Sequence, residues 1–195
     1  RLREEGFARG GREIVHTVNT HERCGTPLEY LVNKQWFIRV LDIKEELLAR
    51  GRSIDWKPAH FRIRYDHWVE NLKWDWCISR QRYFGVPFPL WYCAECGGTV
   101  YASEARLPVD PLTDSPEGAC PDCGCTSFLP EADVMDTWAT SSLTPQINVK
   151  WGEPDQRELE LPMSLRPQAH DIIRTWAFYT IVKAHLHQET IPWST

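Results

Sequence analysis

The stretch LPMSLRPQAHDIIRTWAFYTIVKAHLHQ, residues 161–188, is the most informative about the fold class. Its first seven residues, 161–167, are predicted to form a strand. The rest predicts a helix, because the following residues recur at three- and four-residue steps: Ile172, Ile173, Trp176, Tyr179, Thr180 and Lys183. A strand that leads directly into a helix predicts a parallel α/β unit.

Two further helices are expected upstream of this unit. Residues 34–51 show near-helical spacing of apolar side chains and end at Gly51, a residue typical of helix C-termini. A second, shorter helix is expected after Pro58. Residues 74–81 and 86–93 look extended, because aromatic residues alternate with smaller ones and prolines interrupt the second segment.

The composition is that of a globular protein. Hydrophobic residues make up 42% and charged residues 25% of the 195 residues, which excludes a disordered or collagen-like chain. The net charge of −5 argues against a general nucleic-acid-binding surface, so any contact with nucleic acid must be local. No apolar run approaches the ~20 residues that cross a bilayer, and a cytoplasmic location is expected. The chain begins without Met and ends abruptly, so we expect a piece of a longer protein.

The cysteines predict a metal site. Cys93 and Cys96 form one Cys-x-x-Cys pair and Cys120 and Cys123 a second, and a glycine follows each pair. Four thiolates at this spacing suit a structural Zn²⁺ ion, since a closed shell of four ligands leaves no position for substrate. Cys125 is an alternative ligand. An iron-sulfur cluster and ordinary buried or redox cysteines are the competing interpretations.

A second cysteine signal is incomplete. His21 and Cys24 are separated by two residues and followed by Gly25, as in half of a metal knuckle. A solvated histidine beside a free cysteine explains the pattern equally well.

Three blocks of sequence carry a resemblance to a known family. They are WDWCISRQRYFGVPFPLWYC (74–93), DVMDTWATSSLTP (133–145) and SLRPQAHDIIRTWAFY (164–179). In this order they resemble the catalytic half of class I aminoacyl-tRNA synthetases of the valyl, isoleucyl and leucyl group, and most closely the archaeal-like valyl family. The resemblance implies an α/β fold, the second half of a Rossmann-like nucleotide-binding domain with an inserted zinc-ribbon-like module.

The resemblance also implies a division of the chain. Residues 1–34 would be the end of an editing insertion and a return strand, and residues 35–92 catalytic-domain helices and strands. Residues 93–129 would be the zinc module, and residues 130–195 the second half of the Rossmann-like core.

Site residues follow from the same resemblance. It implies contacts with ATP by Gln168, Ala169, His170 and Asp171, with Asp171 holding the ribose. Ala169 stands where relatives often carry Gly. It implies a valine side-chain pocket lined by Trp138, Ile172 and Trp176, and contacts with phosphate or tRNA by Arg80, Gln81 and Arg82. The competing interpretations are an ordinary helix-start charge for Asp171 and core packing for the apolar residues and for most of the rings in residues 74–93.

The implied activity is that of the full-length enzyme, expected to be monomeric, which would activate valine with ATP and Mg²⁺ and transfer it to tRNA(Val). This chain carries neither the His-x-Gly-His nor the Lys-Met-Ser-Lys-Ser signature, so we expect it to be inactive alone. The alternatives are a fragment of the isoleucyl or leucyl enzyme and a stand-alone zinc-ribbon module that binds RNA or protein.

Overall fold

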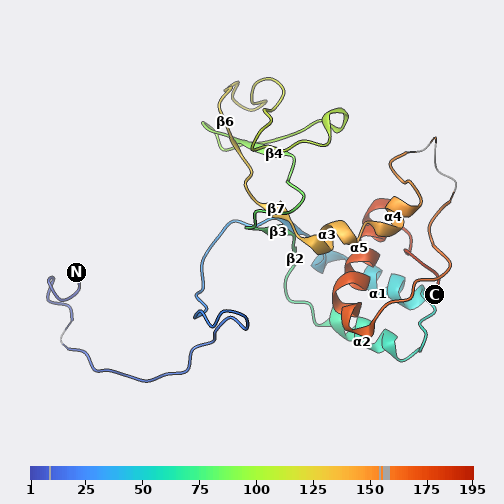
Figure 1. Cartoon of the computed structure of the whole chain (residues 1–195), viewed down its shortest axis with the longest axis horizontal. Coiled ribbons are helices and arrows are strands. Elements are labelled where there is room, and N and C mark those ends of the chain that lie inside the picture. Colours follow the sequence, from blue (N-terminus) through green and yellow to red (C-terminus); the bar gives the residue numbers. More distant parts are fainter. Residues whose placement is uncertain (9, 154, 156–158) are drawn as a thin grey trace. The chain divides into compact units, whose positions relative to one another are not determined.

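The computed structural model describes residues 1–8, 10–153, 155 and 159–195, which fall into two units (Figure 1). The first unit is Arg1–Lys34 and the second is Gln35–Thr195. All described residues of the first unit are exposed, and among them a β-bridge joins Thr20 to Pro27. A hydrophobic core is therefore found in the second unit alone, within the part of the chain that the structure describes.

Three helices surround the core of the second unit. They are α1 (Lys44–Ser53), α2 (Phe61–Glu70) and α5 (Phe178–Gln188), which lie together in Figure 1. The side chains between them are almost fully buried: Val40, Leu47, Tyr65, Val69, Phe178, Ile181 and Val182. Helix α2 confirms the shorter helix expected after Pro58. Of the helix expected up to residue 188, α5 confirms the second half, whereas the first half forms a 3-10 turn (His170–Ile172) and a π-turn (Ile173–Ala177).

The helix expected over residues 34–51 is partly wrong. Its first half forms the short strand β1 (Phe37–Ile38) and a 3-10 turn η1 (Leu41–Ile43), and α1 begins only at Lys44. Strand β1 pairs antiparallel with β2 (Trp76–Cys77), and Asp75 Oδ1 accepts hydrogen bonds from the amides of Val40 and Leu41 at 2.8 and 3.1 Å. These contacts with a distant segment hold the backbone away from a helical path.

Gly51 does not end α1, which continues to Ser53. A Cβ atom at position 51 would lie 2.0 Å from Cε1 of Tyr65, whose ring is fully buried and whose hydroxyl donates to Leu47 O at 2.8 Å. Glycine is therefore needed for the close approach of α1 to α2.

Gly51→Ala is expected to destabilise the second unit by up to about 2 kcal/mol, because an overpacking cost of about 1–3 kcal/mol outweighs the ~1 kcal/mol that alanine gains in a helix. Chemical denaturation measures this free energy of unfolding. Gly152→Ala is the matched control, since no atom lies within 4 Å of its added Cβ. Equal stability of the two variants would contradict the packing argument.

The sheets are small and antiparallel. Strand β3 (Ser79–Arg80) pairs with β7 (Val134–Met135), and the order β5-β4-β6 joins Thr99–Tyr101, Leu90–Cys93 and Phe128–Pro130. Two short helices, α3 (Thr137–Ser141) and α4 (Thr144–Asn148), follow β7.

The strand expected over residues 161–167 does not form in the structure. Met163 instead forms a single parallel bridge with Trp193, and two more hydrogen bonds join Arg166 and Ser164 to Thr195, at 2.8 and 3.2 Å. Between them the chain runs through a 3-10 turn η4 (His170–Ile172), a π-turn η5 (Ile173–Ala177) and α5. Two extended segments joined by a helical region and paired in parallel follow the order of a parallel α/β unit. One β-bridge, however, does not establish a parallel sheet.

The aromatic rings of residues 74–93 divide into two groups. Trp76, Phe88 and Trp91 are buried and Tyr92 is partly buried, whereas three others are exposed: Trp74, Tyr83 and Phe84. The expectation that most of these rings belong to the core is thus wrong for the last three. Among the described helices, none is long and apolar enough to cross a membrane.

Candidate functional site

Two backbone knuckles bring four cysteines together at one end of the β5-β4-β6 sheet. In the first, the amide of Gly97 donates to Cys93 O and the amide of Cys93 donates to Gly98 O, at 2.9 and 2.8 Å. In the second, the amide of Gly124 donates to Cys120 O at 2.8 Å and the amide of Cys120 donates to Cys125 O at 2.7 Å. Gly97 and Gly124 have φ angles of 71° and 75°, a conformation that glycine adopts without strain.

The four thiols form a compact group that could hold a metal ion. Their sulfur atoms all lie within 4.8 Å of one another, with 3.5 Å between Cys93 and Cys123 and 3.6 Å between Cys96 and Cys120. A tetrahedral Zn²⁺ with Zn–S bonds of about 2.3 Å places its sulfurs about 3.8 Å apart, so the geometry fits such an ion. Cys125 lies outside this group and its sulfur accepts a hydrogen bond from the amide of Ser127 at 3.2 Å.

The thiols also differ in acidity. A backbone hydrogen bond from Cys96 lowers the pKa of Cys93 to about 6. A backbone amide of Cys125 acts in the same direction on Cys123, but the hydrogen bonds to the other three thiols and the loss of solvent together outweigh it and raise the pKa of Cys123 to about 12. The cluster therefore favours a Cys93 thiolate beside protonated Cys96 and Cys123, whose pKa values are both raised, and a bound cation would displace their protons.

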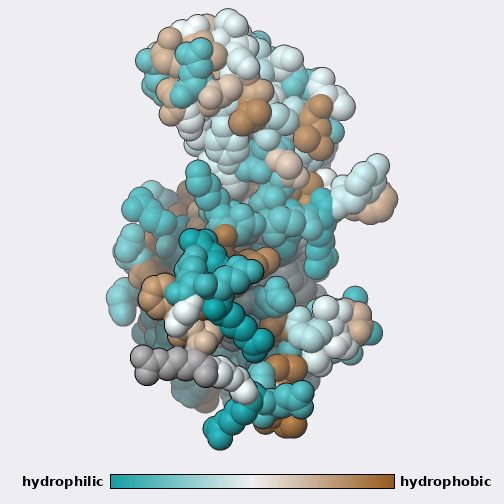
Figure 2. Space-filling model, turned by 90° about the vertical axis from the view of Figure 1, so that its left-hand side faces the viewer, coloured by the Kyte–Doolittle hydropathy of each residue, from teal (hydrophilic) through white to brown (hydrophobic). Residues whose placement is uncertain are grey.

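The module around these thiols has a small core. Four of residues 93–129 are buried, and two of them are cysteines: Cys93, Val109, Pro111 and Cys120. Apolar side chains remain exposed on its surface, including Tyr101, Leu112 and Leu129, and brown patches appear in the upper lobe of Figure 2. A module of this composition is expected to need a metal for stability.

The first unit contains a third knuckle. The amide of Gly25 donates to His21 O and the amide of His21 donates to Thr26 O, both at 2.9 Å, and Gly25 has a φ of 67°. A side-chain hydrogen bond from Thr26 lowers the pKa of Cys24. The backbone thus matches the two cysteine knuckles, although no second pair of ligands lies beside it among the described residues.

The side chains of Trp138, Ile172 and Trp176 line one cavity of about 440 Å³. Thr137, Ser141 and Arg166 complete the lining, and the Arg166 guanidinium lies 4.5 Å above the Trp176 ring. Trp176 is fixed by a hydrogen bond from Nε1 to Ser141 O at 3.2 Å and by stacking on Trp193. The cavity is open and wider than a valine or isoleucine side chain, so its volume does not discriminate between them.

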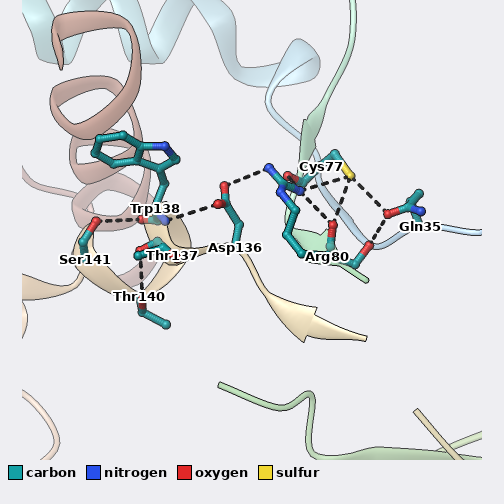
Figure 3. Close-up of polar contacts among 9 residues, drawn as sticks. Gln35, Cys77, Arg80, Asp136, Thr137, Trp138, Thr140 and Ser141 are labelled. Carbon is teal, nitrogen blue, oxygen red and sulfur yellow. Dashed lines mark hydrogen bonds and ion pairs between the residues drawn. The ribbon is translucent and has the colours of Figure 1, made fainter. Parts of the chain in front are cut away.

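Helix α3 carries part of this cavity, and Asp136 is its N-cap residue, directly before Thr137 (Figure 3). Asp136 Oδ1 accepts a hydrogen bond from the amide of Trp138 at 3.4 Å, and the residue is 6% exposed. Arg80 Nη2 lies 3.1 Å from Asp136 Oδ2 and forms an ion pair with it. The N–H groups are not aligned for a hydrogen bond, so Oδ2 has no hydrogen-bond partner within the described residues.

The four residues expected to contact ATP lie at the turn that enters η4. Asp171 is exposed and its Oδ1 lies 3.3 Å from His170 Nε2, while the His170 ring stacks on Phe61 at 5.4 Å. Asp171 and His170 face a cavity of about 470 Å³ between this turn and α2. Gln168 lines a neighbouring cavity of about 300 Å³, and its buried Oε1 has no partner among the residues described.

The Arg80-Gln81-Arg82 run is not a uniform binding surface. Arg80 Nη1 donates to Cys77 O and Ser79 O at 3.1 and 2.8 Å, and Gln81 Nε2 donates to Asp133 Oδ2 at 2.7 Å. Contacts within the chain therefore occupy Arg80 and Gln81. Arg82 is exposed.

Three residues that line the cavity were not expected from the sequence, Thr137, Ser141 and Arg166, nor was Asp136, which caps the helix beside it. The Asp136-Thr137-Trp138 order carries the usual signal of a helix N-cap, an aspartate directly before the first helical residue. Ser141 acts through its backbone carbonyl, for which the sequence offers no signal.

The family model described as class I tRNA synthetases (I, L, M and V) matches residues 13–195. The chain therefore belongs to the class I aminoacyl-tRNA synthetase family. Its similar relatives are valine–tRNA ligases, as expected from the sequence: that of Thermoplasma volcanium is 54% identical over all of this chain, and that of Thermoplasma acidophilum 55% identical over 98% of it. The ligase of Methanopyrus kandleri is 49% identical over 98% of the chain.

The chain spans about a quarter of the length of these relatives: 24%, 24% and 21%. Among solved structures, the LeuRS of Agrobacterium radiobacter K84, in a ternary complex with tRNA and LeuAMS, has a TM-score of 0.45 and 23% identity. The match covers 68% of this chain and 21% of that chain, a likeness too weak to carry an argument.

Proposed function

We propose that this chain is a central part of the catalytic domain of a longer valine–tRNA ligase, which activates valine with ATP and Mg²⁺ and transfers it to tRNA(Val). The observation that carries the proposal is the 54% identity to a valine–tRNA ligase over the whole chain. The match to the family over residues 13–195 leaves no support for a stand-alone zinc-ribbon module. A monomeric state, a cytoplasmic location and the domain boundaries stay predictions.

The amino-acid pocket of this proposal is the cavity of Trp138, Ile172 and Trp176. Two indole rings and a branched aliphatic side chain offer an apolar wall with few polar groups, which suits a small aliphatic side chain. Arg166 at the rim adds a cation that can attract the substrate carboxylate.

The ATP site of the proposal is the strand-to-helix turn at Gln168, Ala169, His170 and Asp171, within a Rossmann-like core. An exposed carboxylate at the start of a helix can accept hydrogen bonds from ribose hydroxyls, and Asp171 is exposed. The unpaired amide oxygen of Gln168 would gain a partner from an N–H group of the base. For phosphate or tRNA we retain Arg82 alone, because Arg80 and Gln81 are engaged within the chain.

The chain provides positioning and charge stabilisation for this chemistry, with no covalent step on its own side chains. The cysteine cluster is proposed to hold Zn²⁺ in a structural role. We propose that the chain does not catalyse the reaction alone, because the triphosphate-binding signatures of the family lie outside it.

A chimera tests the proposal: this chain replaces the matched 24% of the Thermoplasma volcanium ligase, and amino-acid-dependent ATP–pyrophosphate exchange is measured. We expect kcat/KM for valine to exceed that for isoleucine by at least about 10-fold. Ile172→Gln should lower kcat/KM for valine by about 10- to 100-fold, because it places an amide in an apolar wall. Ile63→Gln, at an exposed position of α2, is the control. A folded chimera that prefers isoleucine or leucine would refute the assignment.

A further inference from the structure

Helix α3 organises both tryptophans of the cavity. It carries Trp138, and its residue Ser141 provides the carbonyl oxygen that accepts the Trp176 Nε1 hydrogen bond at 3.2 Å. A helix of five residues is not stable by itself, since helix nucleation is unfavourable and few intrahelical bonds follow. The position of both rings therefore depends on what holds the first turn of α3.

Asp136 holds that turn. Its Oδ1 accepts from the Trp138 amide, and its own amide donates to Ile78 O at 2.6 Å, which joins the start of α3 to the segment before β3. The side chain is 8% exposed, so its second oxygen is a desolvated partial charge. This oxygen has no hydrogen bond within the described part of the chain. The positive charge of the nearby Arg80 guanidinium therefore compensates its negative charge.

Arg80 is itself held in a fixed orientation. Two backbone carbonyls, of Cys77 and Ser79, accept from its Nη1, while Nη2 faces Asp136, as Figure 3 shows. Its backbone lies in β3, paired with Val134 of β7 two residues before Asp136. Because backbone carbonyls hold Nη1 and Asp136 faces Nη2, this guanidinium is arranged to position the Asp136 carboxylate and not to bind a mobile phosphate.

We propose that Arg80 and Asp136 form a positioning pair that fixes α3, and through it Trp138 and Trp176, and so sets the affinity of the pocket for its amino acid. The pair links the extended segment of Arg80 to the cavity without touching the substrate. Because the ligand is taken to be an amino acid, this inference rests on the proposed function.

The kinetic test uses the same chimera with Arg80→Met, Asp136→Asn and the double variant. The asparagine side chain retains an oxygen that can cap α3 but lacks the charge. We expect each single variant to raise KM for valine by about 10- to 100-fold, because a misplaced pocket wall costs up to about two orders of magnitude. The double variant should be no worse than the singles, KM for ATP and tRNA should stay within about twofold, and Arg80→Lys should restore part of the affinity.

Arg39→Met is the control, since Arg39 is exposed and pairs only loosely with Asp42 at 3.8 Å. An Arg80→Met variant with unchanged KM for valine and a raised KM for tRNA or ATP would assign Arg80 to phosphate and overturn the proposal. Additive losses in the double variant would also overturn it.

A spectroscopic measurement separates this proposal from the proposed function. In the chain labelled with 5-fluorotryptophan, the ¹⁹F resonances of Trp138 and Trp176, assigned by Trp→Phe variants, should shift in Arg80→Met and Asp136→Asn but not in Arg39→Met. If the unmodified chimera fails to activate valine, the proposed function fails while these shifts still support the positioning pair. Unshifted resonances in folded variants would contradict it.

Discussion

Removal of the metal is expected to unfold the module of residues 93–129 while the helical core remains folded. The purified chain should contain about one Zn²⁺, and Cys120→Ala should abolish this content, because three thiolates leave the tetrahedral shell open. The module should unfold without the metal because its core is small: two of its four buried residues are themselves cysteines. A metal that links both knuckles replaces the packing that the module lacks.

Hydrogen exchange measured by mass spectrometry can locate this effect. After treatment with a chelator, amides in β4, β5 and β6 should exchange at least about 100-fold faster, while those of α5 keep their protection, because local unfolding requires less free energy than global unfolding. Cys125→Ser is the matched control for Cys120→Ala, because the sulfur of Cys125 lies outside the four-thiol group. Zinc-free protein with a protected sheet, or visible absorption from an iron-sulfur cluster, would contradict the prediction.

Asp171→Ala is expected to reduce the use of ATP in the chimera by about 10- to 100-fold in kcat/KM, the usual effect of losing hydrogen bonds to a charged group. Asp171 does not line the cavity of Trp138 and Trp176, so KM for valine should change little. Measurement of ATP–pyrophosphate exchange at varied ATP and varied valine gives both constants. Because Asp171 is exposed, the folded state should not depend on it, and loss of activity can be separated from loss of structure by thermal unfolding.

A matched control for this substitution is Glu45→Ala, which removes an exposed carboxylate from the first turn of α1. Its ATP kinetics should equal those of the parent chimera. If Asp171→Ala behaved like this control, the interpretation of Asp171 as an ordinary helix-start charge would be preferred and the ribose contact abandoned.

Features that depend on local spacing could be predicted from the amino-acid sequence. Two Cys-x-x-Cys pairs followed by glycine predicted a four-thiol group, because a knuckle needs only a few consecutive residues to form. Helical periodicity likewise predicted α2 and the helical region that ends in α5. The order of three sequence blocks indicated the synthetase family, which the match over residues 13–195 confirms.

Other features depend on distant segments that compete with local preference. Pairing of β1 with β2 delayed the start of α1 to Lys44, and Tyr65 made Gly51 a packing position within the helix. The partner of Arg80 could not be predicted, because Asp136 lies 56 positions further along the chain and the spacing between them carries no signal. Local patterns fix what a few neighbouring residues form, whereas the partner of a buried charge depends on which segments the folded core brings together.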